Sequence, residues 1–245
     1  MGKLDGKVAI ITGGGTGIGR GIADSFISEG CTIVISGRRA EVLEKAKAEL
    51  EADGGTVMTV QSDVTKEDDV ISLFKQTVER FDRLDILVNN AGVSVRGAID
   101  ETSLEDWQYI VNINLTGPFL CTREAMKIMK PQGGGRIINV GSISANVPRP
   151  EAVGYTATKH GMTGLTKTTA LEGRDFGISC GQLNPGNTMS EIMAATQARE
   201  GAAANPTVPV SAQGEAALYM ATLPPEANVL EMTVMPITQP YVGRG

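Results

Sequence analysis

The sequence is poor in the residue types on which metal and disulfide chemistry depend. Its 245 residues include three cysteines and one histidine, with no CxxC or paired Cys/His spacing. Structural zinc sites and disulfide frameworks need several such residues at short, regular spacings. We therefore expect no metal site, and we interpret Cys31, Cys121 and Cys180 as reduced, small apolar residues of a cytoplasmic protein.

Long hydrophobic runs and an excess of basic residues are also missing. No stretch approaches the ~20 apolar residues that span a bilayer, and the first residues, MGKLDGK, lack the apolar core of a signal peptide. The formal net charge is -6, whereas binding to a nucleic acid backbone needs clustered lysine and arginine. We therefore predict a soluble protein with neither a membrane nor a nucleic acid as its partner.

What the sequence does contain is a regular alternation of short β-branched runs and amphipathic segments. This alternation predicts βαβ units, and hence a doubly wound parallel sheet of about seven strands with helices on both faces. No linker, repeat or low-complexity tract divides the chain, so we predict one α/β domain over residues 1–245. The predicted strands are 8–12, 32–36, 56–61, 86–89, 136–140, 179–183 and 229–234. The predicted helices are 18–28, 40–53, 66–81, 104–130 with an interruption near Gly117-Pro118, 155–172 and 213–221.

A glycine-rich turn, TGGGTGIG at positions 12–19, joins the first predicted strand to the first helix. Glycines allow a tight turn and a close approach of the backbone to a pyrophosphate, and the helix N-terminus offers free N–H groups. An ordinary loop is the alternative, but the place between a first strand and a helix favours a dinucleotide site. The residues predicted to contact the dinucleotide here are Gly13, Gly15, Thr16, Gly17, Ile18 and Gly19.

The end of the second predicted strand bears on the choice of cofactor. NAD sites commonly place an acidic residue there for the ribose hydroxyls, but this chain reads Ser36-Gly37-Arg38-Arg39. Arg38 is suited to form charge-assisted hydrogen bonds with a 2′-phosphate, and Gly37 leaves room for that group. We therefore favour NADP(H). Two solvated arginines at a helix start, with NAD(H) as the cofactor, are the alternative.

Tyr155 and Lys159 are four residues apart on a predicted helix, so their side chains share one face. An unperturbed phenol has a pKa of about 10, and a neighbouring ammonium favours the phenolate. Such a pair can pass a proton to or from a substrate oxygen. A surface Tyr–Lys pair is the alternative for this motif taken alone.

Ser142 follows a predicted buried strand and precedes Tyr155 by thirteen residues. It therefore lies at the carboxyl edge of the sheet, where open α/β folds place their ligands. Its hydroxyl is suited to polarise a carbonyl group. A turn serine is the alternative interpretation, and Ser144 competes for the same role.

Six of these features together resemble the short-chain dehydrogenase/reductase family, in its order and at its spacings over nearly the whole chain. They are the glycine turn, Asn89-Asn90-Ala91-Gly92, Asn114, Ser142, the Tyr155/Lys159 pair and Pro185-Gly186. The family spacing selects Ser142 over Ser144. The resemblance implies a single Rossmann domain, a nicotinamide cofactor, and a homodimer or homotetramer.

The resemblance also implies roles for individual residues. Asn114 would hold a water that connects Lys159 to solvent, and Lys159 and Tyr155 would contact the nicotinamide ribose. Asp63 would contact the adenine, although a helix N-cap is a competing interpretation; for Asn114 the competing role is a bond to neighbouring backbone. The further cofactor contacts implied are Val64, Asn89, Asn90, Ala91, Gly92, Pro185, Gly186, Thr188 and Ser190.

Two segments depart from the family pattern. The glycine turn has an additional glycine, Gly14, which we expect to be harmless. The segment 223–245 lacks the usual family ending, so the subunit contact made there is an open question. The Met- and Ala-rich segment at about 187–212 is interpreted as a substrate lid, with an interface helix as the alternative.

The sequence thus predicts an NADP(H)-preferring oxidoreductase that interconverts a ketone or aldehyde and an alcohol, with Tyr155 as general acid/base. A catalytically idle dinucleotide-binding or redox-sensing protein is one alternative. A methyltransferase is another, which the missing acidic ribose ligand disfavours. His160, the single histidine, points about 100° away from Lys159 around the helix, so a Ser–His–Asp hydrolase fits poorly. The candidate substrate-pocket residues are Val93, Ser94, Arg96, Asn146, Val147, Arg149 and Met189, of which Arg96 and Arg149 would suit an acidic substrate or simply face water.

Overall fold

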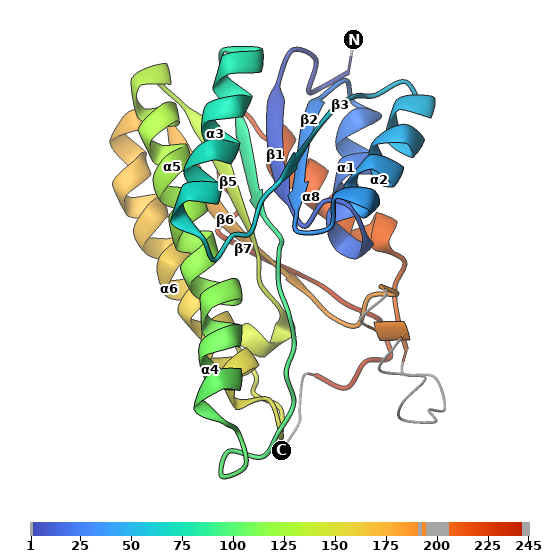
Figure 1. Cartoon of the computed structure of the whole chain (residues 1–245), viewed down its shortest axis with the longest axis vertical. Helices are drawn as coiled ribbons and strands as arrows, with labels where there is room; N and C mark the ends of the chain where they lie inside the picture. Colours follow the sequence, from blue (N-terminus) through green and yellow to red (C-terminus); the bar gives the residue numbers. More distant parts are fainter. Residues whose placement is uncertain (1, 191–192, 195–205, 242–245) are drawn as a thin grey trace.

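The computed structural model describes residues 2–190, 193–194 and 206–241. Its centre is a seven-stranded parallel sheet of order β3-β2-β1-β4-β5-β6-β7 (Figure 1). The predicted doubly wound fold is therefore confirmed. The strands are β1 (Val8–Thr12), β2 (Thr32–Gly37), β3 (Thr56–Gln61), β4 (Ile86–Asn89), β5 (Gly135–Val140), β6 (Ile178–Pro185) and β7 (Glu231–Val234).

Helices cover both faces of the sheet (Figure 1). On one face lie α1 (Gly17–Ile27), α2 (Ala40–Ala52) and α8 (Val210–Thr222). On the other lie α3 (Glu67–Phe81), α5 (Gly117–Gln132) and α6 (Val153–Gly173). Because the inner strands are covered on both sides, strands such as β1 and β2 are nearly continuous apolar runs rather than alternating. In β2, for example, Ile33 and Ile35 pack on the first face while Val34 packs on the second.

The predicted long helix 104–130 has a structural interruption. It divides into α4 (Leu104–Val111), a π-helical turn η1 (Asn112–Thr116) and α5. Pro118 at the start of α5 has no N–H to continue the hydrogen-bond ladder. A Cβ on Gly117 would lie 2.8 Å from a Val64 methyl, so the break also allows a close helix contact.

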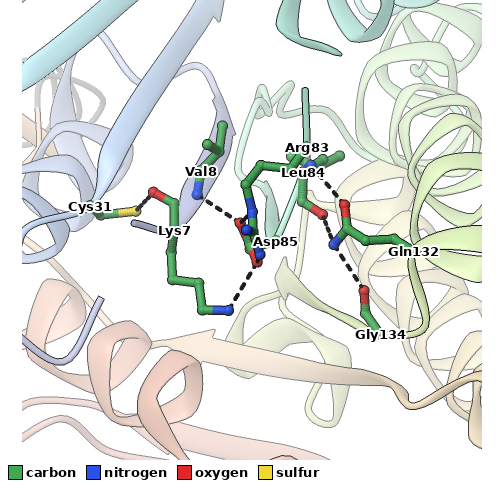
Figure 2. A network of polar contacts seen from close by, with 8 residues as sticks. All are labelled: Lys7, Val8, Cys31, Arg83, Leu84, Asp85, Gln132 and Gly134. Carbon is green, nitrogen blue, oxygen red and sulfur yellow. Dashed lines mark hydrogen bonds and ion pairs between the residues drawn. The ribbon is translucent and has the colours of Figure 1, made fainter. Parts of the chain in front are cut away.

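Asp85 organises the amino edge of the sheet (Figure 2). Its carboxylate accepts hydrogen bonds from Arg83 Nε at 2.7 Å, Lys7 Nζ at 3.1 Å and the Val8 N–H at 3.0 Å. Burial alone would raise the pKa of Asp85, but the bonds from Arg83, Val8 and Lys7 outweigh it and hold that pKa below its ordinary value. This network ties the start of β1 to the start of β4.

Several sequence-based boundaries need adjustment. α8 begins at Val210 rather than at 213, and β7 begins at Glu231 rather than at 229, as a half-exposed edge strand. Residues 191–192 and 195–205, half of the segment 187–212 interpreted as a lid, lie outside the described residues. All three cysteines are buried and free, as expected. Within the described part of the chain, no helix is long and apolar enough to cross a membrane.

Candidate active site

The sheet has its topological switch point between β1 and β4, where the chain's crossovers run in opposite directions. Open α/β folds form a ligand crevice there, beyond the carboxyl ends of the strands. Two cavities share the glycine turn at this point. The β2-side cavity is lined by Gly13, Gly15, Thr16, Gly37, Arg38, Arg39, Asp63, Val64, Ala91 and Gly92, among others. The β5-side cavity, of about 400 Å³, is lined by Thr16, Gly17, Ile18, Asn90, Ser142, Tyr155, Lys159, Pro185, Gly186, Thr188 and Ser190, among others.

Backbone geometry explains the glycines of the turn. Gly13 and Gly17 have φ values of +65° and +56°, in the left-handed region that glycine adopts without strain. A Cβ on Gly19 would lie 2.4 Å from Asn90 Nδ2. A Cβ on Gly14 would lie 2.6 Å from an Ile35 methyl. The additional glycine therefore fits the turn, which packs directly onto β2 there and leaves no room for a larger residue.

The N-terminus of α1 is open to a ligand. Its N-cap residue, Thr16, makes no side-chain cap bond, and its first turn contains no acidic residue. The N–H groups of that first turn therefore point toward the cavities without an internal acceptor. Together with the helix dipole, they provide a site for an anion such as a pyrophosphate.

Asn90 holds the glycine turn in place. Its Nδ2 donates to the carbonyl oxygens of Thr12, at 2.9 Å, and Gly13, at 3.1 Å. Asn89, by contrast, does not line either cavity. It is buried and donates to Asn139 Oδ1 at 2.8 Å, because consecutive residues of a strand point to opposite sides. The resemblance-based placement of Asn89 beside the cofactor was thus wrong.

The β2-side cavity combines exposed cations with one carboxylate. Arg38 and Arg39 line it at the end of β2. Asp63 is the one acidic side chain among the described residues that line it. Asp63 Oδ1 accepts bonds from Thr65 N–H at 3.0 Å and Thr65 Oγ1 at 2.8 Å. The competing N-cap interpretation was wrong, because the N-cap of α3 is Lys66.

Lys159 is a buried cation beside Tyr155. Its side chain is 5% exposed, and its Nζ donates to the Val140 carbonyl oxygen at 2.8 Å. The same Nζ lies 5.6 Å from the centre of the Tyr155 ring. Burial lowers the pKa of Lys159, and the interaction with Tyr155 partly offsets this effect. Among the residues for which contacts are described, no carboxylate lies next to Lys159 Nζ. Burial therefore disfavours the charged form of this side chain.

Ser142 lines the β5-side cavity and is 4% exposed. It follows β5 in extended backbone geometry, and its N–H donates to Asn184 Oδ1 at 3.1 Å. Its Oγ accepts the N–H of Ser144 at 3.1 Å, so its own hydrogen remains available as a donor. Ser144 is fully buried and is not part of the cavity lining. The structure thus brings together Ser142, Tyr155 and Lys159, as the spacing predicted.

Asn114 lies on the π-helical turn η1, close to Gly92 and Lys159. Its Oδ1 accepts the Val93 N–H at 2.8 Å, and its Nδ2 donates to the Val93 carbonyl oxygen at 2.9 Å. A Cβ added to Gly92 would lie 3.4 Å from Asn114 Oδ1 and 4.0 Å from Lys159 Nζ. The Asn114 side chain therefore clamps the segment after β4 next to Lys159. Its backbone partner is 21 residues away in sequence rather than a neighbour, and its Nδ2 also donates to Thr158 Oγ1 at 3.4 Å.

Sequence reasoning missed the polar supports beneath the site. Gln182 Nε2 donates to Asn184 Oδ1 at 2.7 Å, and both side chains are fully buried. Gln213 of α8 donates to Thr188 Oγ1 at 3.0 Å. The available signal was the pair of polar residues within the apolar strand β6. Of the predicted substrate-pocket residues, Val93, Ser94, Arg96 and Arg149 line the β5-side cavity, whereas Asn146, Val147 and Met189 do not.

These features suit an extended dinucleotide. The two cavities meet at the uncapped start of α1, which fits a pyrophosphate between two nucleotide halves. The β2-side cavity carries Arg38 at its wall, and the β5-side cavity carries the proton-transfer groups. Among the described residues, no group of three or more His, Cys, Asp or Glu is placed to hold a metal ion.

Comparison with known proteins agrees with this geometry. The family model described as short chain dehydrogenase matches residues 7–201. A 3-oxoacyl-[acyl-carrier-protein] reductase of Synechocystis sp. is 37% identical over 187 residues, which are 76% of this chain and 76% of the relative. A 3beta-hydroxysteroid dehydrogenase of Mediterraneibacter gnavus is 38% identical over 189 residues, or 77% of this chain and 68% of the relative.

Two solved structures share nearly the whole fold. Actinorhodin polyketide ketoreductase with NADPH has a TM-score of 0.89 and 29% identity, covering 94% of this chain and 96% of its own. A putative gluconate dehydrogenase from Agrobacterium tumefaciens has a TM-score of 0.88 and 30% identity, covering 94% and 95%. This chain belongs to the short-chain dehydrogenase family, whose members bind NAD(P)(H) and act as oxidoreductases.

Proposed function

We propose that this protein is an NADP(H)-preferring reductase that interconverts a ketone or aldehyde and the corresponding alcohol. The observation that carries the proposal is the buried Lys159 side chain next to Tyr155, in a cavity that Ser142 also lines. A buried charge without an anionic partner is costly to maintain. A role in proton transfer at the neighbouring phenol accounts for its presence.

The residues around the two cavities would hold the cofactor. The first-turn N–H groups of α1 would bind the pyrophosphate, and Arg38 would form charge-assisted bonds with the 2′-phosphate. When bound, NADPH supplies the hydride that reduces the carbonyl carbon. The proposed contacts for its two ends are Asp63 and Val64 at the adenine, and Asn90, Ala91, Gly92, Pro185, Gly186 and Thr188 at the nicotinamide side.

Three side chains would act on the substrate oxygen. Ser142 donates a hydrogen bond to the carbonyl, which stabilises the charge that develops on its oxygen. Tyr155 gives its proton to that oxygen as the alcohol forms. Lys159 stabilises the resulting phenolate through its positive charge. We also propose that Asn114 holds a water between Lys159 and solvent, consistent with its place beside Gly92.

Oxidation of NADPH in the presence of a panel of ketones and aldehydes tests this function. We expect loss of absorbance at the reduced nicotinamide together with one equivalent of alcohol for at least one carbonyl. Binding of NADPH without turnover of any carbonyl would contradict the proposal and would favour the idle dinucleotide-binding alternative.

We further propose that the protein is a homodimer or homotetramer. Three large apolar side chains, Leu104, Tyr109 and Phe119, are 69%, 41% and 48% exposed along α4 and α5. Exposed apolar residues on neighbouring helices are typical of subunit contacts. Light scattering is expected to report at least twice the chain's 25.7 kDa, and a monomer at micromolar concentration would overturn this proposal.

A further inference from the structure

The β5-side cavity is strongly cationic in a protein that is acidic as a whole. Four cationic side chains line it, and no aspartate or glutamate does so among the described residues. The chain's formal net charge is -6. A concave surface lined by one sign of charge raises the local concentration of ligands of the opposite sign. The four cations are Arg39, Arg96, Arg149 and Lys159.

The cofactor and the proton transfer account for two of these cations. Lys159 is buried against Val140 and Tyr155. Arg39 lines both cavities, next to the glycine turn where the pyrophosphate is proposed to bind. Arg96 and Arg149 line only the β5-side cavity. For Arg149, neither the pyrophosphate nor the 2′-phosphate explains this position.

Arg149 is fixed by the same serine that positions the Ser142 hydroxyl. Its Nε donates to Ser144 Oγ at 3.1 Å, and the Ser144 N–H donates to Ser142 Oγ at 3.1 Å. Ser144 is 0% exposed, so water does not compete for this bond at the serine. The Nη1 and Nη2 groups of Arg149 make no hydrogen bond to any residue that the structure describes. These two nitrogens are the edge of a guanidinium that pairs with a carboxylate in bidentate fashion.

The segments that carry the two arginines are joined next to the cavity. The Gly97 N–H donates to the Glu151 carbonyl oxygen at 3.1 Å, and Gly97 forms a parallel bridge with Ala152. Glu151 has a φ of +57°, a conformation that non-glycine residues adopt rarely and at an energetic cost. Such strain occurs preferentially at ligand sites. The bridge therefore fixes the backbone just beyond Arg149 against the segment that carries Arg96.

We propose that the carbonyl substrate carries a carboxylate and that Arg149 binds it; this rests on the proposed reductase function. Arg149 holds the carboxylate through Nη1 and Nη2, while Ser142 and Tyr155 hold the carbonyl oxygen. Hydride adds to the carbonyl carbon and the Tyr155 proton to its oxygen, so a keto acid becomes a hydroxy acid and NADPH becomes NADP⁺. Because Ser144 anchors both Arg149 and Ser142, only a short chain separates the two groups of the substrate.

Matched acid and ester pairs test this assignment. The substrates are 3-oxobutanoate, 4-oxopentanoate and 5-oxohexanoate, each beside its methyl ester, with NADPH as reductant. For at least one chain length we expect kcat/KM for the acid to exceed that for the ester by about tenfold or more. The reason is that the ester cannot form the charge-assisted bidentate pair with Arg149. We expect Arg149→Gln to bring this ratio near one, mainly through KM, and Arg149→Lys to give an intermediate ratio.

Arg174→Gln is the matched control, because it removes one positive charge from an exposed residue that does not line the cofactor or substrate cavities. It is expected to keep the wild-type ratio. Equal rates for acids and esters in the wild type would overturn the carboxylate assignment and leave the reductase function standing. A preference for dihydroxyacetone phosphate over dihydroxyacetone, without one for the acids, would overturn it in favour of a phosphate.

Calorimetric binding to the NADPH complex covers the case in which no carbonyl is turned over. That result contradicts the reductase function, but the anion site is still measurable with 4-oxopentanoate and its methyl ester. Binding of the acid that is about tenfold tighter than that of the ester, and that Arg149→Gln abolishes, supports the site. Equal binding of acid and ester overturns it.

Discussion

Two buried charges lie at opposite edges of the same sheet, and their surroundings differ. Asp85, at the amino edge, receives bonds from two cations and a backbone N–H (Figure 2). Lys159, near the carboxyl edge, has one bond to a carbonyl oxygen and a phenol ring for a neighbour. The environment lowers the pKa of both groups, which favours the charged form of Asp85 and disfavours that of Lys159.

The difference separates a structural charge from a functional one. At Asp85 the bonds from Arg83, Lys7 and Val8 stabilise the carboxylate, and these bonds contribute to the free energy of folding. At Lys159 no carboxylate among the described residues offsets the desolvation cost, which points to a role with a ligand or in a reaction. If this distinction holds, substitutions at the two edges will change different measured quantities.

The largest effect is expected for Lys159→Met. Loss of the ammonium that stabilises the phenolate should lower kcat by about 100-fold or more. The free energy of unfolding should change by no more than about 1 kcal/mol, because methionine fills a similar volume and the desolvation cost disappears. Steady-state kinetics and urea denaturation measure the two quantities. A loss of several kcal/mol with normal turnover would make Lys159 a structural charge.

Asp85→Asn should show the reverse pattern. The substitution leaves Arg83 and Lys7 without their carboxylate and should lower the free energy of unfolding by about 2–4 kcal/mol. The value of kcat for the folded enzyme should stay within about twofold. The reason is that Asp85 lies at the edge of the sheet opposite the catalytic groups. A large loss of kcat with normal stability would break the comparison.

The contribution of Asp85 should also depend on pH. Its folded pKa lies below the ordinary value of 3.8, so the stabilisation is fully present above about pH 5. It is lost as the pH falls through the lower, folded value. The difference in unfolding free energy between wild type and Asp85→Asn should therefore shrink between pH 5 and pH 2. A constant difference over that range would show that the carboxylate charge is not responsible.

Arg38→Ala extends the comparison to an exposed charge at the carboxyl edge. Loss of a charge-assisted bond to a 2′-phosphate should weaken NADPH binding by about 10- to 100-fold and leave NADH binding nearly unchanged. Stability should not change measurably, because Arg38 is exposed. Fluorescence titration with both cofactors measures the ratio. If Arg38→Ala weakened the binding of NADPH and NADH equally, Arg38 would not be the residue that binds the 2′-phosphate.

The smallest effect is expected for Lys7→Met. The Lys7 side chain is 46% exposed, and Arg83 retains its own pair with Asp85. Half-exposed ion pairs contribute about 0–1 kcal/mol, so the unfolding free energy should fall by less than about 1 kcal/mol. A loss as large as that of Asp85→Asn would place most of the network's stabilisation in this one bond.

Local sequence patterns predicted most of the fold and the convergence of the site. Runs such as VAIIT in β1 are apolar because both of their faces are covered. Ser142 follows β5 at the carboxyl edge of the sheet, and Tyr155 and Lys159 lie near the start of α6 and line the same cavity. Asn90 and Gly92 follow β4 to the same edge.

Features that depend on contacts between distant segments were not predictable. The packing of Gly14 on Ile35 and the buried Gln182–Asn184 support beneath Ser142 depend on pairings across the sheet. The place of Asp63 in the chain also suited a helix N-cap. Its carboxylate instead accepts the N–H of Thr65, before α3 begins. The anchoring of Arg149 on Ser144 depends on how the loop after β5 closes.

A single-turnover experiment tests the central claim most directly. The NADPH complexes of the wild type and of Tyr155→Phe are mixed with a carbonyl substrate, and the decay of NADPH fluorescence is followed. Removal of one phenolic proton donor should slow this step by about 10²- to 10⁴-fold, with NADPH affinity unchanged. A rate within about threefold of the wild type would show that the proton comes from elsewhere, and would leave the buried Lys159 without its proposed role.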